Sequence, residues 1–158
     1  MSTLIVYSTK YGCAQKCAQM LSEKLNGKVD LCNLKTSKAL DPAAYDKVVI
    51  GGSIYIGKVQ KEVSRFCSDN RSILKDKTIG LFICGMFKDQ AEKELKDSFP
   101  LEILNNAVAK EFLGGEFVFK KMNPVERLMV KRIAKVDKDL TDISEENINR
   151  IVQSMNNI

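Results

Sequence analysis

The sequence predicts an α/β fold in which a doubly wound, five-stranded parallel sheet carries helices on both faces. Short apolar runs typical of strands alternate along the chain with segments whose apolar residues recur at helical spacing. The second run alternates apolar and polar residues, as in an edge strand, whereas the first and third are continuous, as in central strands. This pattern favours the strand order 2-1-3-4-5, because the other common doubly wound order needs a sixth strand.

The first half of the chain supplies three strands and two helices. The expected elements, in chain order, are a strand at 4–7, a helix at 14–25, an edge strand at 28–31, a strand at 48–52 and a helix at 59–67. Asn26 and Gly27 close the first helix as a C-terminal cap. Right-handed crossovers between parallel strands then place helices on both faces of the sheet.

The second half supplies two more strands and a basic segment. A strand at 78–84 precedes a mostly helical stretch at 89–107 that is interrupted near Pro100. The runs at 111–113 and 117–119 flank two glycines, and together they predict a fifth strand with a bulge or break. Ser144 opens a last helix with an acidic first turn. We expect a single domain over residues 1–158, with a basic amphipathic helical insertion at about 120–140.

The composition is that of a globular protein, and it excludes several chemistries. The chain is 44% hydrophobic and 28% charged, which provides enough apolar material for one core. The absence of His excludes Ser-His and Cys-His catalytic pairs and His-ligated metals. The five Cys are scattered without a CxxC pair, so neither a disulfide framework nor a zinc site is expected. We therefore predict no metal site and a reducing, cytoplasmic location.

The net charge of +5 comes entirely from residues 120–135, which read KKMNPVERLMVKRIAK. This basic segment holds six basic residues and one acid, and the rest of the chain holds 19 of each sign. Asn123 predicts a helix N-cap, with Pro124 in the first turn. Such a helix could lie on an anionic membrane surface, dock on an acidic partner, or pack as a solvated surface helix. Nucleic acid is not expected, because the segment offers no aromatic stacking platform.

The loop after the first strand predicts a phosphate site. It joins a buried strand to a helix N-terminus, where free backbone N–H groups and the helix dipole favour an anion. Hydroxyl groups, a lysine and a glycine that permits close approach add to this preference. The candidate residues are Ser8, Thr9, Lys10, Tyr11, Gly12, Cys13 and Ala14. The alternative is a hydroxyl-rich capping turn that binds no ligand.

Two further loops at the same sheet edge predict a site for a planar ligand. Tyr55 could stack on such a ligand while Ser53 and backbone amides bond to its polar edge, and Met86 or Phe87 could cover its other face. The candidate residues are Ser53, Ile54, Tyr55, Ile56, Gly57, Lys58, Gly85, Met86 and Phe87. The alternatives are that Tyr55 covers a hydrophobic edge and that Met86 is a core contact.

Cys13 occupies a helix N-terminus, where the pKa of a thiol can be lowered. A redox-active or phosphate-adjacent thiol is one interpretation, and a small residue tolerated beside the phosphate is the favoured one. Cys17 faces the core with Ala18 and Leu21, and Cys84 ends a buried strand, so we predict that both are core residues.

Three segments carry a resemblance to a known family: STKYGCA, YDKVVIGGSIYIGKVQKEVSRF and FKKMNPVERLMVKRIAK. They resemble the flavodoxin-domain family of bacterial menaquinone-dependent protoporphyrinogen IX oxidases (dehydrogenases). The resemblance implies a flavodoxin-like fold and FMN as cofactor. It places the phosphate on residues 8–14, the isoalloxazine ring between the 53–58 and 85–88 loops, and Gly114 and Gly115 nearby. The family usually has Thr where Ala14 stands, so one phosphate hydroxyl is missing.

The resemblance also implies a function. The chain would be an FMN-dependent oxidoreductase that passes electrons from a reduced substrate through FMN to a quinone, on the inner face of the cell membrane. No catalytic side chain is expected, because the flavin performs the redox chemistry. The alternatives are a flavodoxin-type diffusible electron carrier, which docks on a redox partner protein, and a non-catalytic flavin-binding module. Carriers of this class are generally acidic, so the +5 charge favours the enzyme.

Overall fold

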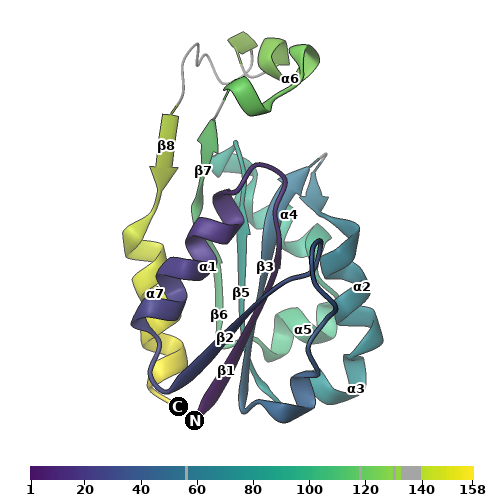
Figure 1. Cartoon of the computed structure of the whole chain (residues 1–158), viewed down its shortest axis with the longest axis vertical. Helices are drawn as coiled ribbons and strands as arrows, with labels where there is room; N and C mark the ends of the chain where they lie inside the picture. Colours follow the sequence, from purple (N-terminus) through teal and green to yellow (C-terminus); the bar gives the residue numbers. More distant parts are fainter. Residues whose placement is uncertain (56, 118, 130, 133–139) are drawn as a thin grey trace.

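The computed structural model describes residues 1–55, 57–117, 119–129, 131–132 and 140–158. Its main sheet has five parallel strands in the order β2-β1-β3-β5-β6, which confirms the predicted topology (Figure 1). These strands are β1 (Ser2–Ser8), β2 (Lys28–Asn33), β3 (Lys47–Tyr55), β5 (Thr78–Cys84) and β6 (Ala109–Phe112). The two-residue strand β4 (Lys58–Val59) folds back antiparallel on the end of β3.

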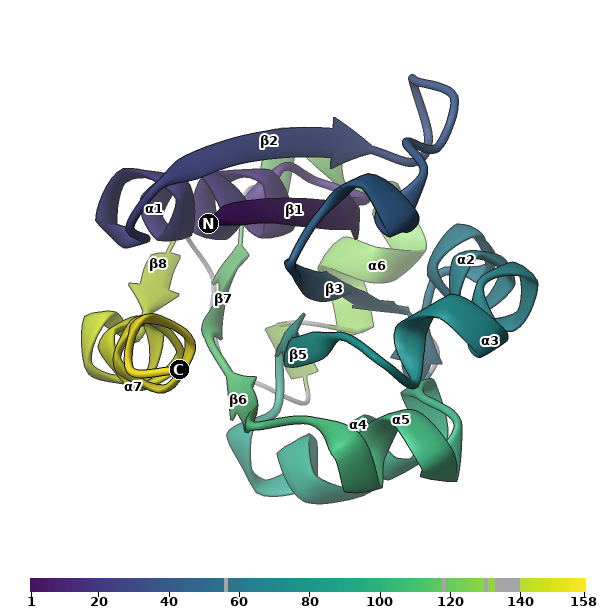
Figure 2. The same cartoon turned by 90° about the horizontal axis from the view of Figure 1, so that it is seen from below.

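Helices cover both faces of the sheet, as Figure 2 shows. The first face packs against α1 (Cys13–Lys24) and α7 (Glu145–Asn156). The second face packs against α2 (Lys61–Asp69), α3 (Arg71–Leu74), α4 (Ala91–Ser98) and α5 (Leu101–Asn106). Short 3-10 turns lie at Pro42–Ala44, Lys88–Gln90 and Phe119–Lys121.

Burial on both faces explains the continuous apolar runs. In β1, Leu4 and Val6 belong to the core on the α2–α5 side, while Ile5 and Tyr7 belong to the core on the α1 and α7 side. Successive side chains of a strand point to opposite faces, so a central strand needs an apolar residue at every position. β2 lies at the edge, as predicted, but its burial does not follow the alternating pattern, because Leu31 is exposed and Asp30 is half-buried.

The fifth strand differs from the prediction. The break at the glycine pair is present, but it separates β6 from β7 (Gly114–Phe117), which leaves the main sheet and pairs antiparallel with β8 (Leu140–Ile143). Gly114 makes this corner with a φ of 93°, a conformation that side chains disfavour. β8 was not predicted from the sequence, and Val118 of the predicted strand lies outside the described residues.

The helix predicted from Val59 begins two residues later. Val59 lies in β4, where its N–H donates to the Ser98 hydroxyl at 3.0 Å, and α2 starts at Lys61 after Gln60. The helical stretch interrupted near Pro100 is confirmed as α4 and α5. The Ser144 cap of α7 is also confirmed, since its side chain accepts the N–H of Asn147 at 3.2 Å.

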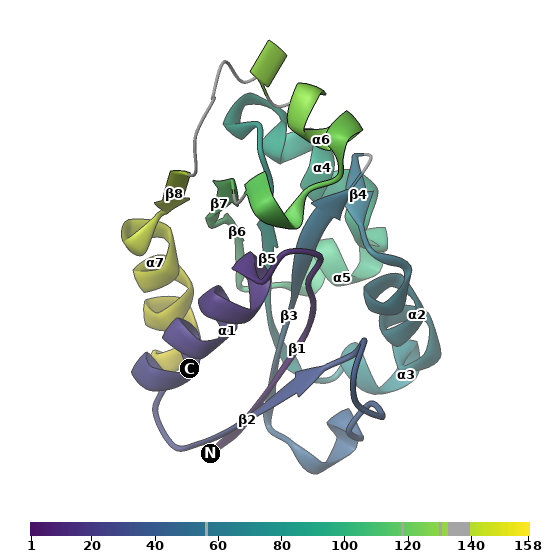
Figure 3. The same cartoon turned by 45° about the horizontal axis from the view of Figure 1, so that its top comes forward.

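The basic segment contains the helix α6 (Pro124–Met129). Asn123 and Glu126 cap it reciprocally: the Glu126 N–H donates to Asn123 Oδ1 at 2.8 Å, and the Asn123 N–H donates to Glu126 Oε1 at 3.3 Å. Residues 130 and 133–139 of the expected insertion lie outside the described residues. Figures 1 and 3 place α6 beyond the end of the sheet at which α1 begins. None of the described helices combines the length and apolarity needed to cross a bilayer.

The corner at Gly114 predicts a large stability difference between two glycine substitutions. A side chain on Gly114 would overlap the Asp142 carbonyl, whereas one on Gly57, whose φ is 82°, would meet open space. We expect Gly114→Ala to lower the free energy of unfolding by about 3 kcal/mol or more, and Gly57→Ala by about 1 kcal/mol. Urea denaturation followed by circular dichroism measures both, and equal losses would contradict the role assigned to the corner.

Candidate functional site

The register of the central strands brings the predicted site together at the carboxyl ends of these strands. Ser8 pairs with Gly52 across β1 and β3, and Ser53 pairs with Cys84 across β3 and β5. The loops that follow these three strands therefore begin side by side at the carboxyl ends of the sheet. In a doubly wound sheet this edge is where ligands bind.

Thr9 closes the turn between β1 and α1. Its hydroxyl accepts the Gly12 N–H at 2.9 Å and lies 3.4 Å from the Ser53 hydroxyl. Gly12 precedes α1 with a left-handed φ of 99°, and the first turn of the helix carries no acidic residue. The first N–H groups of a helix have no intrahelical partner, so this turn presents free donors to solvent.

Three lysine side chains contact or belong to this turn. Lys35 Nζ donates to the Thr9 carbonyl at 3.4 Å, and Lys121 Nζ donates to the Tyr11 carbonyl at 3.1 Å. Lys10 belongs to the turn itself. Two of these lysines come from distant parts of the sequence, and all three place positive charge beside a helix N-terminus. The arrangement suits a phosphate group, which combines negative charge with several acceptor oxygens.

The other residues of the predicted phosphate loop, apart from Tyr11, have buried side chains. Ser8 is fully buried, and its hydroxyl lies 3.0 Å from Gln60 Oε1 and 3.3 Å from Glu62 Oε2, so it ties β1 to the start of α2. The side chains of Cys13 and Ala14 are buried in the core beneath α1. Only the backbone of Cys13 and Ala14 is placed to serve a ligand. The part of Ser8 in phosphate binding stays a prediction.

Tyr11 supplies a buried hydroxyl that lacks a hydrogen-bond partner among the described residues. A buried polar group without a partner is costly, and a ligand that bonds to it removes the cost. Tyr11 packs with Met86 and Phe119 around the buried side chain of Met122. The basic segment thus lies directly against two of the predicted loops.

Tyr55 presents its ring at the surface, with 42% of the residue exposed. The Lys10 ammonium lies 3.3 Å from the centre of this ring and 3.7 Å from Glu126 Oε2. A cation on an aromatic face is held by about 0.5–1 kcal/mol at exposed sites, which a stacking ligand can replace. The Tyr55 ring is exposed but Lys10 covers one of its faces, so stacking of Tyr55 on a ligand stays a prediction.

The remaining residues of the two ring loops are placed around Tyr55 and Met86. Ile54 is half-buried against the core, and Gly57 and Lys58 are exposed. Ile56 lies outside the described residues. Phe87 is half-buried and directly precedes the 3-10 turn at Lys88–Gln90.

Gly114 and Gly115 hold the third loop in place. The Gly85 N–H donates to the Gly114 carbonyl at 2.9 Å, and a side chain on Gly115 would overlap the Gly85 carbonyl. Two backbones can approach this closely only without a Cβ. The glycine pair thus positions the Gly85 loop, and a direct contact with a ligand stays a prediction.

Glu94 is a buried residue that the sequence analysis missed. It is 7% exposed, its Oε1 has no partner among the described residues, and a side chain built on Gly85 would come within 3.5 Å of that atom. Burial raises the pKa of Glu94, and the nearby charge of Asp89 adds to the increase. Glu94 and Ser98 are both buried and lie four residues apart, on the inner face of α4. This spacing is the signal in the sequence from which the polar pair could have been recognised.

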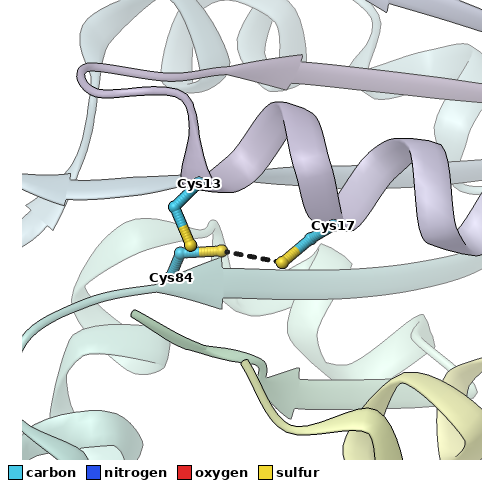
Figure 4. Close-up of side chains that lie close together, drawn as sticks. All are labelled: Cys13, Cys17 and Cys84. Atoms are coloured by element: carbon cyan, nitrogen blue, oxygen red, sulfur yellow. Dashed lines mark hydrogen bonds between the residues drawn. The ribbon is translucent and has the colours of Figure 1, made fainter. Parts of the chain in front are cut away.

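Three cysteines also meet beneath the site, although the sequence analysis placed two of them only in a general core. Cys13 and Cys17 project from α1 toward Cys84 at the end of β5 (Figure 4). The Cys84 S–H donates to Cys17 Sγ at 3.6 Å. Hydrogen bonds from the other two thiols lower the pKa of Cys13, while sharing the proton with Cys13 raises the pKa of Cys17. The four-residue spacing in α1 was the available signal.

The turn and the two loops lie at the switch point of a doubly wound sheet, which is where this class of α/β fold binds nucleotides. The chain belongs to the flavodoxin domain family, whose model matches residues 4–144. This finding confirms the flavodoxin part of the resemblance and does not extend it to protoporphyrinogen oxidases. None of the curated proteins matches the sequence.

Solved structures show the same fold. The flavodoxin of Streptococcus pneumoniae TIGR4 is 21% identical, with a TM-score of 0.60, and the match covers 98% of this chain and 95% of that one. A short-chain flavodoxin associated with a non-canonical PDU bacterial microcompartment is 17% identical, with a TM-score of 0.62 and coverages of 98% and 94%. The rubredoxin oxygen:oxidoreductase of Desulfovibrio gigas is 11% identical, with a TM-score of 0.56, and the match covers 98% of this chain but only 34% of that one.

The buried carboxyl predicts a pH-dependent effect on stability. Because the pKa of Glu94 is raised in the folded state, that state binds more protons than the unfolded chain between the ordinary and the raised pKa, and stability falls as pH rises through this window. Glu94→Gln should therefore raise the free energy of unfolding at about pH 7.5 by more than about 0.5 kcal/mol, and by less at about pH 4.5. The exposed Glu92→Gln on the same helix is the control, measured by urea denaturation. A Glu94→Gln effect independent of pH would contradict the assignment.

Proposed function

We propose that this chain binds FMN and acts as an FMN-dependent oxidoreductase. The observation that carries the proposal is the lysine-ringed turn between β1 and α1, which lies beside the exposed ring of Tyr55. A phosphate site next to a stacking surface fits a ligand that joins a phosphate to a planar ring system. Membership of the flavodoxin family supports FMN as that ligand.

The residues present fit the cofactor. The first turn of α1, Lys10, Lys35 and Lys121 would hold the phosphate. Tyr55 and the Gly85–Phe87 loop would hold the ring. When bound, FMN supplies one- and two-electron transfer at its isoalloxazine ring. The protein supplies binding, orientation and charge, and Lys10 must leave the Tyr55 face when a ring stacks there.

We further propose that the electrons pass from a reduced substrate to a membrane quinone. The basic segment supports this, because it packs on the phosphate loop through Met122, Lys121 and the Lys10–Glu126 ion pair. Its helix exposes the apolar side chains Val125, Leu128 and Met129 beside exposed basic residues. A surface that is both basic and apolar suits an anionic bilayer, and a protein bound there can reach a membrane quinone. The resemblance to protoporphyrinogen oxidases makes a porphyrinogen the first substrate to try.

A second candidate is a diffusible electron carrier. The extent of the structural match favours this candidate, because the chain covers 95% of the pneumococcal flavodoxin. In that case the basic segment would dock on an acidic redox partner protein. A third candidate, a non-catalytic flavin-binding module, would bind FMN without turnover.

Lys121 allows a direct test of the phosphate site. We expect Lys121→Gln to weaken FMN binding about fivefold, since one charged contact at a partly exposed site is worth about 1 kcal/mol. Lys120→Gln removes the same charge from the adjacent residue and should change the affinity by less than about twofold. Quenching of flavin fluorescence measures both dissociation constants. Equal effects of the two substitutions would show that Lys121 does not contact the ligand.

The quinone proposal predicts that oxidation of the reduced protein depends on anionic lipid. Replacing Lys120, Lys131 and Arg132 together by Gln should weaken binding to anionic vesicles about a hundredfold, because each basic residue near such a surface contributes about 1 kcal/mol. The matched control replaces the exposed Lys28, Lys75 and Lys96. Stopped-flow absorbance follows flavin oxidation by a menaquinone analogue held in neutral or anionic vesicles, and porphyrin fluorescence follows porphyrinogen oxidation.

The outcomes separate the three candidates. Rapid oxidation by quinone in anionic vesicles, lost in the triple variant and kept in its control, supports the enzyme. One-electron exchange with a reductase and no reaction with quinone would establish the carrier instead. Bound FMN that reacts with neither would establish the binding module. Failure to bind FMN at all would overturn the common basis of all three.

A further inference from the structure

The thiols of Cys13, Cys17 and Cys84 form a cluster that the flavin site does not use. The three sulfur atoms all lie within 4.8 Å of one another, and Cys84 Sγ lies 3.6 Å from Cys17 Sγ. All three residues are buried, at 6%, 0% and 3% exposure respectively. Two adjacent turns of α1 and the last residue of β5 supply them, so rigid elements fix their positions (Figure 4).

The spacing of the sulfur atoms is that of a three-coordinate metal site. Three thiolates at about 2.3 Å from a central ion, in one plane with it, lie about 4.0 Å from one another. One observed separation is 3.6 Å and the other two are at most 4.8 Å, so small side-chain rotations would bring the three sulfurs to a common centre.

The donor set selects the class of ion. The chain contains no His, and the cluster identified among the described residues is made of sulfur alone. Thiolates select soft ions such as Cu(I). Structural zinc takes four ligands, and catalytic zinc keeps an open position for water, which a buried three-sulfur site does not offer. A monovalent soft ion matches both the number of donors and their burial.

The surroundings offset part of the negative charge that thiolate ligands bring. Cys13 is the first residue of α1, where the helix dipole favours negative charge. The nearby Lys16 ammonium is already paired with the Glu116 carboxylate at 2.7 Å, so the helix dipole is the main contribution. Each thiol that becomes a ligand releases its proton to solvent.

We propose that Cys13, Cys17 and Cys84 form a binding site for a soft thiophilic cation of the Cu(I) class. The site stands apart from the proposed flavin function, because it lies beneath the phosphate turn and uses side chains that face the core. Cys13 belongs to both sites: its sulfur is part of the thiol cluster, and its backbone is part of the phosphate turn.

The test is an anaerobic titration of the full-length protein with Cu(I) in competition with a colorimetric Cu(I) chelator. We expect one Cu(I) per chain, and we expect Cys17→Ala and Cys84→Ala each to lower the affinity at least about tenfold. Cys67→Ala, which removes a buried sulfur from α2, should leave the affinity unchanged. Circular dichroism checks that each variant folds, and Cys84→Ser serves where Cys84→Ala does not.

X-ray absorption of the wild-type complex gives a second readout that needs no variant. A shell of three sulfur atoms without nitrogen or oxygen supports the proposal. Stoichiometric binding that survives both Cys17→Ala and Cys84→Ala would overturn it. Absence of binding, a disulfide between two of the three cysteines in the protein isolated without reductant, or preferential binding of zinc with oxygen ligands would overturn it as well.

Discussion

The parallel pairing of β1, β3 and β5 is the constraint on which the rest of the structure depends. Their register brings Ser8, Ser53 and Cys84 to one edge and leaves each strand to continue as a loop at that edge. Burial on both faces holds these strands, since the residues of β1 alternate between two cores. The phosphate turn, the ring loops and the thiol cluster are all consequences of where three strands end.

In the sequence the basic segment looks like a surface feature, but in the structure it packs against the candidate site. Its charge looks like a general property of the chain, yet Lys121 reaches the phosphate turn and Glu126 pairs with Lys10. Glu126, the only acid of the segment, is buried, and it both caps α6 and pairs with Lys10. The segment therefore connects the turn between β1 and α1 to the exposed basic and apolar surface of α6. In the enzyme that we propose, a docking surface and a redox site would be neighbours for this reason.

The sequence reveals those features that depend on local pattern. Continuous and alternating apolar runs identify central and edge strands, and the Asn123–Pro124 pair identifies the start of α6. The glycine pair at 114 and 115 reveals a break but not that the chain then pairs with β8, because pairing between distant segments leaves little trace in either one. Lys35 and Lys121 at the phosphate turn, Glu94 under Gly85 and the meeting of Cys84 with α1 were missed for the same reason. Each requires knowing which loops or faces the fold brings together.

The central claim is that the turn between β1 and α1 holds the phosphate of a flavin nucleotide. The most direct measurement compares the affinities of the wild-type protein for FMN and for riboflavin, which lacks the phosphate, across a range of salt concentrations. We predict that FMN binds at least about tenfold more tightly than riboflavin at low salt, and that the difference in affinity narrows as salt screens the lysines. Equal affinities for the two flavins at low salt would contradict it.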